Sequence, residues 1–130
     1  MKIMVCYDSS KSAQEALKVS IQHAKHFKAK VYLVTSLMGG SKDDPDENRK
    51  AEDNLEYGKS IVEKEGIECE TRLMIRGMES GEDLVKFANE NDIEEILIGI
   101  QRTSKVGKLL FGSTAQHVIL EARCPVVTVK

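Results

Sequence analysis

The stretch EILIGIQRTSKVGKLLFGSTAQHVILEARCPVVTVK, residues 95–130, shows the fold class of this chain most clearly. Ile96–Ile98 is a short apolar run, Ser113–Ala122 has a helix-like apolar pattern, and Val126–Val129 is a second apolar run. Two strands joined through a helix are typical of a parallel sheet. The small, basic and hydroxyl residues between the first strand and the helix raise the question of whether this loop is a turn or a binding loop.

The same alternation of strands and helices runs through the rest of the chain. Apolar runs predict strands near residues 3–7, 31–34 and 67–75. Helix-like spacing predicts helices near residues 13–27 and 47–64, and a third that opens at a capping box, Ser80-Gly-Glu-Asp83. Five strands alternating with four helices predict an α/β fold with a mostly parallel, doubly wound sheet and helices on both faces. The third strand contains alternating polar residues, which places it nearer a sheet edge.

The composition of the 130-residue chain, with 41% hydrophobic and 31% charged residues, predicts one soluble domain over residues 1–130. The net charge of −2 makes nucleic acid a poor partner, and no apolar run is long enough to cross a membrane. The start, MKIMVCYDSS, becomes polar too early for a secretory signal. Widely spaced Cys6, Cys69 and Cys124 predict buried, reduced thiols and therefore a cytoplasmic protein.

Catalytic and metal-binding patterns are absent from the sequence. His23 and His26 are three residues apart on a predicted helix, but no nearby acid or cysteine completes a metal set, so surface histidines are favoured. The segment around Lys108 is not a Walker A motif, because Arg102 stands where that motif needs glycine. No GxGxxG follows the first strand, and no serine elbow is present. We therefore expect no catalytic residue, no metal site and at most slow ATP hydrolysis.

A binding site is predicted at the carboxyl ends of the strands, because doubly wound sheets bind ligands there, where the strand order reverses. The first and fourth strands most plausibly flank this reversal. Asp8 follows the first strand and has a simpler interpretation as a cap of the first helix, which is compatible with a ligand role. The strand ends carry Asp8-Ser9-Ser10, Thr35-Ser36, Arg76-Gly77 and the loop that begins at Gly99.

The loop from Gly99 ends at Gly112-Ser113-Thr114, where the fourth helix begins. The first N–H groups of a helix have no internal partner and favour anions such as phosphate. Gly99 and Gly112 would let a ligand approach the backbone closely. Positive charge would come from Arg102, Lys105 and Lys108. The alternative is that Ser113 or Thr114 only caps the helix and that the basic side chains are solvated.

The chain resembles the universal stress proteins of the UspA type in their single-domain form. The family motif G-x2-G-x9-G-[S/T] is matched by Gly99, by the nine residues 103–111 and by Gly112-Ser113, with Arg102 in place of the second glycine. The turn Asp8-Ser9-Ser10 and the final Cys-Pro-Val-Val-Thr-Val, residues 124–129, extend the resemblance to the whole chain. The resemblance implies a Rossmann-like, five-stranded parallel sheet in the order 3-2-1-4-5.

The resemblance also implies a ligand, because the nucleotide-binding branch of the family holds ATP or AMP, with or without Mg²⁺. We expect the Arg102 guanidinium to contact phosphate where the family uses glycine backbone. The resemblance further points to a homodimer, whose contact would be the apolar edge strand Val126–Val129. The nucleotide-binding residues carried over are Asp8, Ser36 through its backbone, Gly99, Gly112, Ser113 and Thr114.

Three functions stay open at the level of sequence. The favoured one is a cytoplasmic stress-response or signalling protein that binds an adenine nucleotide and is not a true enzyme. The second is a family member that binds no nucleotide and acts through protein partners. The third is a weak ATP hydrolase.

Overall fold

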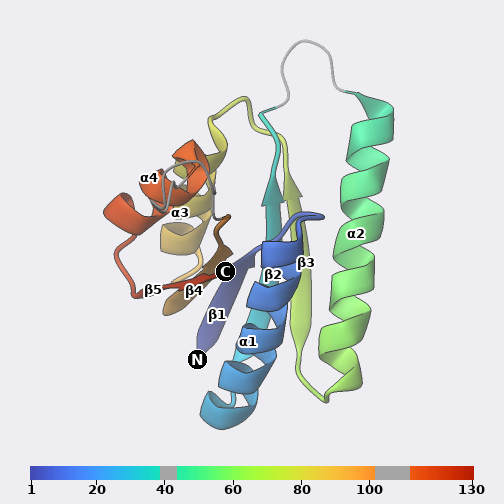
Figure 1. Cartoon of the computed structure of the whole chain (residues 1–130), viewed down its shortest axis with the longest axis vertical. Helices are drawn as coiled ribbons and strands as arrows, with labels where there is room; N and C mark the ends of the chain where they lie inside the picture. Colours follow the sequence, from blue (N-terminus) through green and yellow to red (C-terminus); the bar gives the residue numbers. More distant parts are fainter. Residues whose placement is uncertain (39–43, 102–111) are drawn as a thin grey trace.

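The computed structural model describes residues 1–38, 44–101 and 112–130. Neighbouring strands are all parallel, and their order is β3-β2-β1-β4-β5 (Figure 1). The predicted doubly wound sheet and its order are therefore confirmed. The elements are β1 (Lys2–Cys6), α1 (Lys11–Phe27), β2 (Lys30–Ser36), α2 (Pro45–Lys64), β3 (Cys69–Met74), α3 (Ser80–Glu90), β4 (Glu95–Gly99), α4 (Ser113–Glu121) and β5 (Val126–Val129).

Helices cover both faces of the sheet, with α1 and α2 on one face and α3 and α4 on the other (Figure 1). Alternate residues of a strand point to opposite faces of the sheet. Ile3 and Val5 pack in the core with α1 and α2, whereas Met4 packs in the core with α3 and α4. A strand that is buried on both faces needs apolar side chains at every interior position. This explains the unbroken apolar runs of the central strands.

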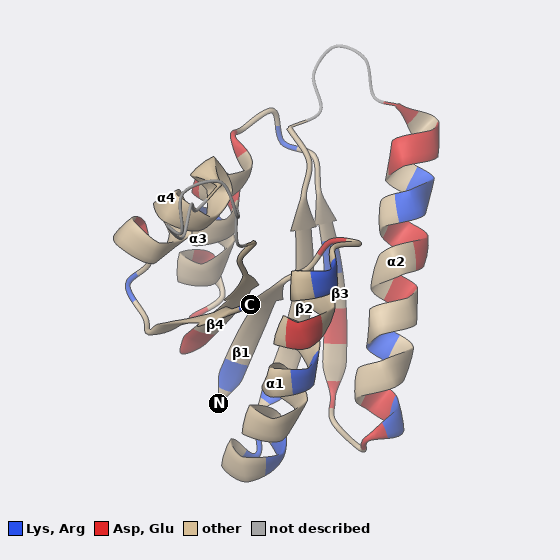
Figure 2. Ribbon diagram, viewed as in Figure 1, with Lys and Arg blue, Asp and Glu red and all other residues tan. Residues whose placement is uncertain are grey.

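The three central strands, β1, β2 and β4, each carry a charged residue only at their first position. Most other charges lie along the helices, and α2 carries both signs along its length (Figure 2). The last residues of these three strands are therefore uncharged. β3 lies at a sheet edge, as its polar alternation predicts. None of the described helices is long and apolar enough to cross a membrane.

Two helix starts differ from the sequence predictions. The prediction of a capping box at Ser80 is wrong. Ser80 is the first residue of α3 and Glu79 is its N-cap, and no side chain of the described residues caps this helix. The Ser80 hydroxyl instead donates to the backbone oxygen of Ser36 at 2.9 Å. The second helix begins at Pro45 rather than near Glu47, because the Asp44 carboxylate accepts hydrogen bonds from the first-turn N–H groups.

The first helix is capped by Ser10 and not by Asp8, because the Ser10 hydroxyl accepts from the Ala13 N–H at 3.1 Å. Farther along the same helix, His23 is not a simple surface histidine. Its Nδ1 lies 2.7 Å from Oε1 of Glu95, whose side chain is only 13% exposed. The acid was missed because it lies at the start of β4, far away in sequence.

Candidate functional site

A pocket of about 550 Å³ lies at the carboxyl ends of β1, β2 and β4, against the starts of α1, α3 and α4. It brings together most of the predicted site residues, from five separate elements and loops. Ser113 is not among the described residues that line it. Arg102, Lys105 and Lys108 lie outside the described residues. The predicted residues in the lining are Asp8, Ser36, Gly99, Gly112 and Thr114.

Gly99 lines this pocket, but its glycine has a packing reason that the sequence did not reveal. A Cβ atom at Gly99 would lie 2.4 Å from the carbonyl carbon of Ser12 and 2.6 Å from its oxygen. Real Cβ contacts are never this short, and the obstacle is helix backbone that cannot rotate away. Gly99 therefore allows the first turn of α1 to lie directly against the end of β4.

Gly112 differs from Gly99, because no feature of the described residues explains its glycine. A Cβ atom there would meet none of the described atoms within 4 Å. Its φ of −63° and ψ of 162° are accessible to any residue. Packing and backbone conformation within the described chain therefore leave this position free to carry a side chain.

Gly112 is also the N-cap of α4, and no side chain of the described residues caps this helix. The alternative prediction that Ser113 or Thr114 serves as the cap is therefore wrong, because both lie inside the helix. The first N–H groups of an α-helix have no intrahelical partner, and the helix dipole makes this end positive. The start of α4 thus presents N–H donors at the pocket, where Thr114 lies in the lining.

Asp8 is the one Asp, Glu, His, Lys or Arg among the described lining residues. Its Oδ1 accepts a hydrogen bond from the Ser10 N–H at 2.8 Å, which holds the exposed carboxylate at the end of β1. The described residues give its Oδ2 no hydrogen-bond donor. Burial, and after it the charge of Asp8, raises the pKa of the neighbouring Cys6 thiol to about 12. Cys6 is therefore a neutral thiol and not a thiolate nucleophile at neutral pH.

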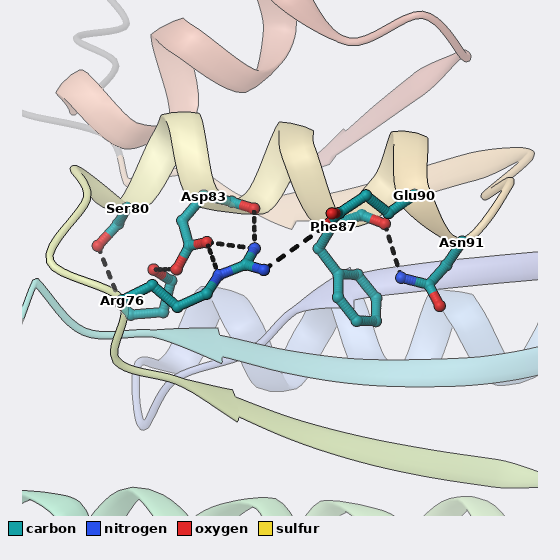
Figure 3. Close-up of polar contacts among 7 residues, drawn as sticks. Arg76, Ser80, Asp83, Phe87, Glu90 and Asn91 are labelled. Atoms are coloured by element: carbon teal, nitrogen blue, oxygen red, sulfur yellow. Dashed lines mark hydrogen bonds and ion pairs between the residues drawn. The ribbon is translucent and has the colours of Figure 1, made fainter.

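Ser36 forms the pocket wall at the end of β2, and its polar side-chain and carbonyl groups bind protein. Its hydroxyl donates to Oδ2 of Asp83 at 2.8 Å, and its carbonyl accepts from Ser80. Arg76 donates from Nε to Oδ1 of Asp83 at 2.6 Å, so one carboxylate joins the ends of β2 and β3 to α3 (Figure 3). Sequence reasoning missed Asp83, because its spacing from Ser80 suggested a helix cap instead.

Apolar side chains cover the part of the pocket near β2 and α3. Val34 and Leu37 come from the end of β2, and Leu84 comes from the first turns of α3. β2 and β4 lie on opposite sides of β1, so Val34 and Leu37 lie at the other side of β1 from the end of β4, whereas α3, which carries Leu84, packs against α4. Among the residues in the described ranges, no three His, Cys, Asp or Glu side chains are grouped to hold a metal ion.

The doubly wound sheet and the pocket at the carboxyl ends of its central strands define a Rossmann-like α/β protein with a pocket where the strand order reverses. The chain belongs to the universal stress protein family, whose model matches residues 1–130. It is 33% identical over 140 residues to a universal stress protein of Methanocaldococcus jannaschii, which covers 99% of this chain and 81% of the relative. The family predicted from the motif spacing is confirmed.

Solved structures of Archaeoglobus fulgidus proteins are similar over the whole chain. One universal stress protein is 40% identical, with a TM-score of 0.92, over 100% of this chain and 98% of that chain. Another, solved in complex with dAMP, is 37% identical, with a TM-score of 0.87 and the same coverage.

Proposed function

We propose that this chain binds an adenine nucleotide in the pocket at the carboxyl ends of β1, β2 and β4. The observation that carries the proposal is Gly112, which lines the pocket although no described atom and no backbone strain requires glycine there. A ligand against the start of α4 would supply the missing reason, because a side chain would occupy its space. The similarity to the dAMP-bound protein of Archaeoglobus fulgidus supports an adenine nucleotide as the occupant.

The phosphate lies at the start of α4 in this proposal. The helix has nine residues and no described side-chain cap, so its first N–H groups are available to an anion. Arg102 lies outside the described residues, and its contact with phosphate stays a prediction from sequence. Replacement of Arg102 by alanine would then weaken AMP and ATP binding and leave adenosine binding unchanged.

In this proposal the base lies at the β2 side of the pocket, against Val34, Leu37 and Leu84. Transfer of an aromatic base from water to an apolar wall lowers the free energy, whereas transfer of a phosphate raises it. Asp8 lies at the end of β1, between β2 and β4 in the sheet, where its carboxylate can accept a hydrogen bond from a ribose hydroxyl. The base thus meets an apolar wall, the ribose meets the Asp8 carboxylate as an acceptor, and the phosphate meets the N–H donors at the start of α4.

Calorimetric titration of the purified protein tests this proposal. We expect AMP and ATP to bind, and adenosine to bind more weakly because it lacks the phosphate. Equal binding of AMP and GMP would contradict the adenine part. No binding of any of these ligands would reject the proposal and favour a family member that acts through protein partners. Phosphate release from excess ATP, measured with and without Mg²⁺, would favour the weak hydrolase.

We also propose that the protein is a cytoplasmic homodimer joined through β5. β5 is an edge strand in which Val126, Val127 and Val129 are only half-buried, and edge strands pair readily. The free cysteines fit a reducing compartment. Light scattering that gives the monomer mass at high micromolar concentration would end the dimer proposal. An unchanged dimer after deletion of residues 126–130, in a variant that still folds, would exclude β5 as the contact.

A further inference from the structure

We propose that Asp83 is a positioning residue that, through Ser36 and Arg76, sets the shape of the base end of the pocket. This inference rests on the proposed nucleotide binding. Asp83 is not itself among the lining residues, so it would act only through the residues in front of it.

The Asp83 side chain is fully buried and is held from two sides. Ser36 donates to its Oδ2 at 2.8 Å, and Arg76 donates through Nε to its Oδ1 at 2.6 Å (Figure 3). A buried carboxylate is costly unless each oxygen has a hydrogen-bond partner, so loss of either donor would leave a buried oxygen without its partner. The positions of Ser36 and Arg76 are therefore tightly linked to that of Asp83.

The residues around Asp83 form the pocket wall. Ser80 and Leu84 flank it within α3, and both line the pocket together with Ser36. The Ser80 hydroxyl donates to the Ser36 carbonyl, which gives a second link between β2 and α3. Asp83 thus lies directly behind the wall that Ser36, Ser80 and Leu84 present to the pocket.

The link extends to the edge strand. The Leu37 N–H donates to the carbonyl of Met74, the last residue of β3, at 2.9 Å. Arg76 follows Met74 by two residues and donates a hydrogen bond to Asp83. The ends of β2 and β3 and the start of α3 are therefore linked by hydrogen bonds, and a shift of Leu37 away from β3 would break its bond to Met74.

This arrangement predicts which part of a nucleotide depends on Asp83. The hydroxyl and carbonyl of Ser36 are already bonded within the protein, so the wall contributes through its shape rather than through these two groups. A displaced wall would reduce contact with the base. The base is common to adenosine and AMP, whereas the phosphate at α4 is not.

The test is calorimetric titration of adenosine and AMP into the parent protein, Ser36→Ala, Asp83→Asn and the double variant. Each single variant should bind both ligands more weakly than the parent by the same factor, about tenfold in affinity, which corresponds to about 1.4 kcal/mol. The loss of affinity in the double variant should be smaller than the product of the two single factors, because both changes break the same contact between Ser36 and Asp83. Thermal melting must first show each variant folded, because a partly unfolded variant would lose apparent affinity for both ligands by the same factor.

Two matched controls lie away from the pocket. Ser20→Ala removes a fully buried hydroxyl that bonds to Leu17 within α1. Glu95→Gln neutralises a largely buried, paired carboxylate at the opposite end of the sheet. Both should bind adenosine and AMP as the parent does.

Parent affinity for both ligands in folded Ser36→Ala would overturn the inference, and so would a loss confined to AMP. If Asp83→Asn does not fold, Ser36→Ala decides alone. If the parent itself binds neither ligand, the proposed function fails and the inference fails with it. Binding by the parent with unchanged Ser36→Ala refutes the inference alone.

Discussion

At the scale of single residues, the two glycines Gly99 and Gly112 of one motif have different physical reasons. The motif spacing predicted that both belong to the site, and both line the pocket. The spacing could not reveal that Gly99 contacts the backbone of Ser12, because Ser12 lies at the other end of the chain and only the folded sheet brings it near. It also could not reveal that a Cβ atom added at Gly112 would meet none of the described atoms within 4 Å.

The contrast between these glycines predicts different stabilities for two alanine variants. Gly99→Ala places a methyl group against rigid helix backbone and should lower the free energy of unfolding by at least about 1–3 kcal/mol, a typical cost of overpacking. Gly112→Ala should change it little, because no described atom lies within 4 Å of the new Cβ. Urea unfolding at neutral pH measures both. Equal stabilities of the two variants would contradict the packing reason for Gly99.

At the scale of elements, strand and helix order was readable from sequence, but two helix starts were not. A Ser-x-x-Asp pattern is local, whereas the partners of Ser80 and Asp83 include Ser36, at the end of β2. Tertiary contacts therefore replaced the predicted capping box. The start of α2 differs for the opposite reason, because a local cap, Asp44, begins the helix at Pro45 instead of near residue 47.

Removal of that cap should weaken α2. Asp44→Ala leaves the N–H groups of Asp46 and Glu47 without their acceptor and should cost about 0.5–2 kcal/mol of stability. Asp53→Ala makes the same change in the exposed middle of α2, where alanine is the better helix former, and should cost nothing. The check is the midpoint of urea unfolding. An Asp44→Ala midpoint equal to that of Asp53→Ala would show that the cap contributes no stability.

At the scale of the whole molecule, the sheet order followed from the family resemblance rather than from periodicity. Alternating strands and helices predict a parallel sheet, but they do not determine which strand lies beside which. The wall contacts of Asp83 were not predictable for a related reason, because a buried ion pair depends on which loops the sheet order brings together. The apolar neighbours of the three cysteines predicted buried thiols, and Cys69 is buried, whereas Cys6 and Cys124 are partly buried.

The buried thiols predict a loss of stability in alkali. Burial raises the pKa of Cys6 and of Cys69 to about 12 from a value of 9.0. Because the folded pKa lies above the unfolded one, this contribution is complete below pH 9 and is lost as the pH rises toward 12. Urea unfolding at several pH values above 8 should show falling stability. The Cys6→Ala/Cys69→Ala variant should show a shallower fall, and an identical slope would disprove the role of the thiols.

Titration of AMP into the parent, Gly112→Val and Ala122→Val measures directly whether the pocket holds a nucleotide at the start of α4. Gly112 and Ala122 flank α4 with similar extended backbone, φ −63° and ψ 162° against φ −65° and ψ 142°, but only Gly112 lines the pocket. Once thermal melting has shown both variants folded, we predict that Gly112→Val binds AMP at least about tenfold more weakly. Ala122→Val should match the parent. Parent affinity in Gly112→Val would contradict nucleotide binding at this site.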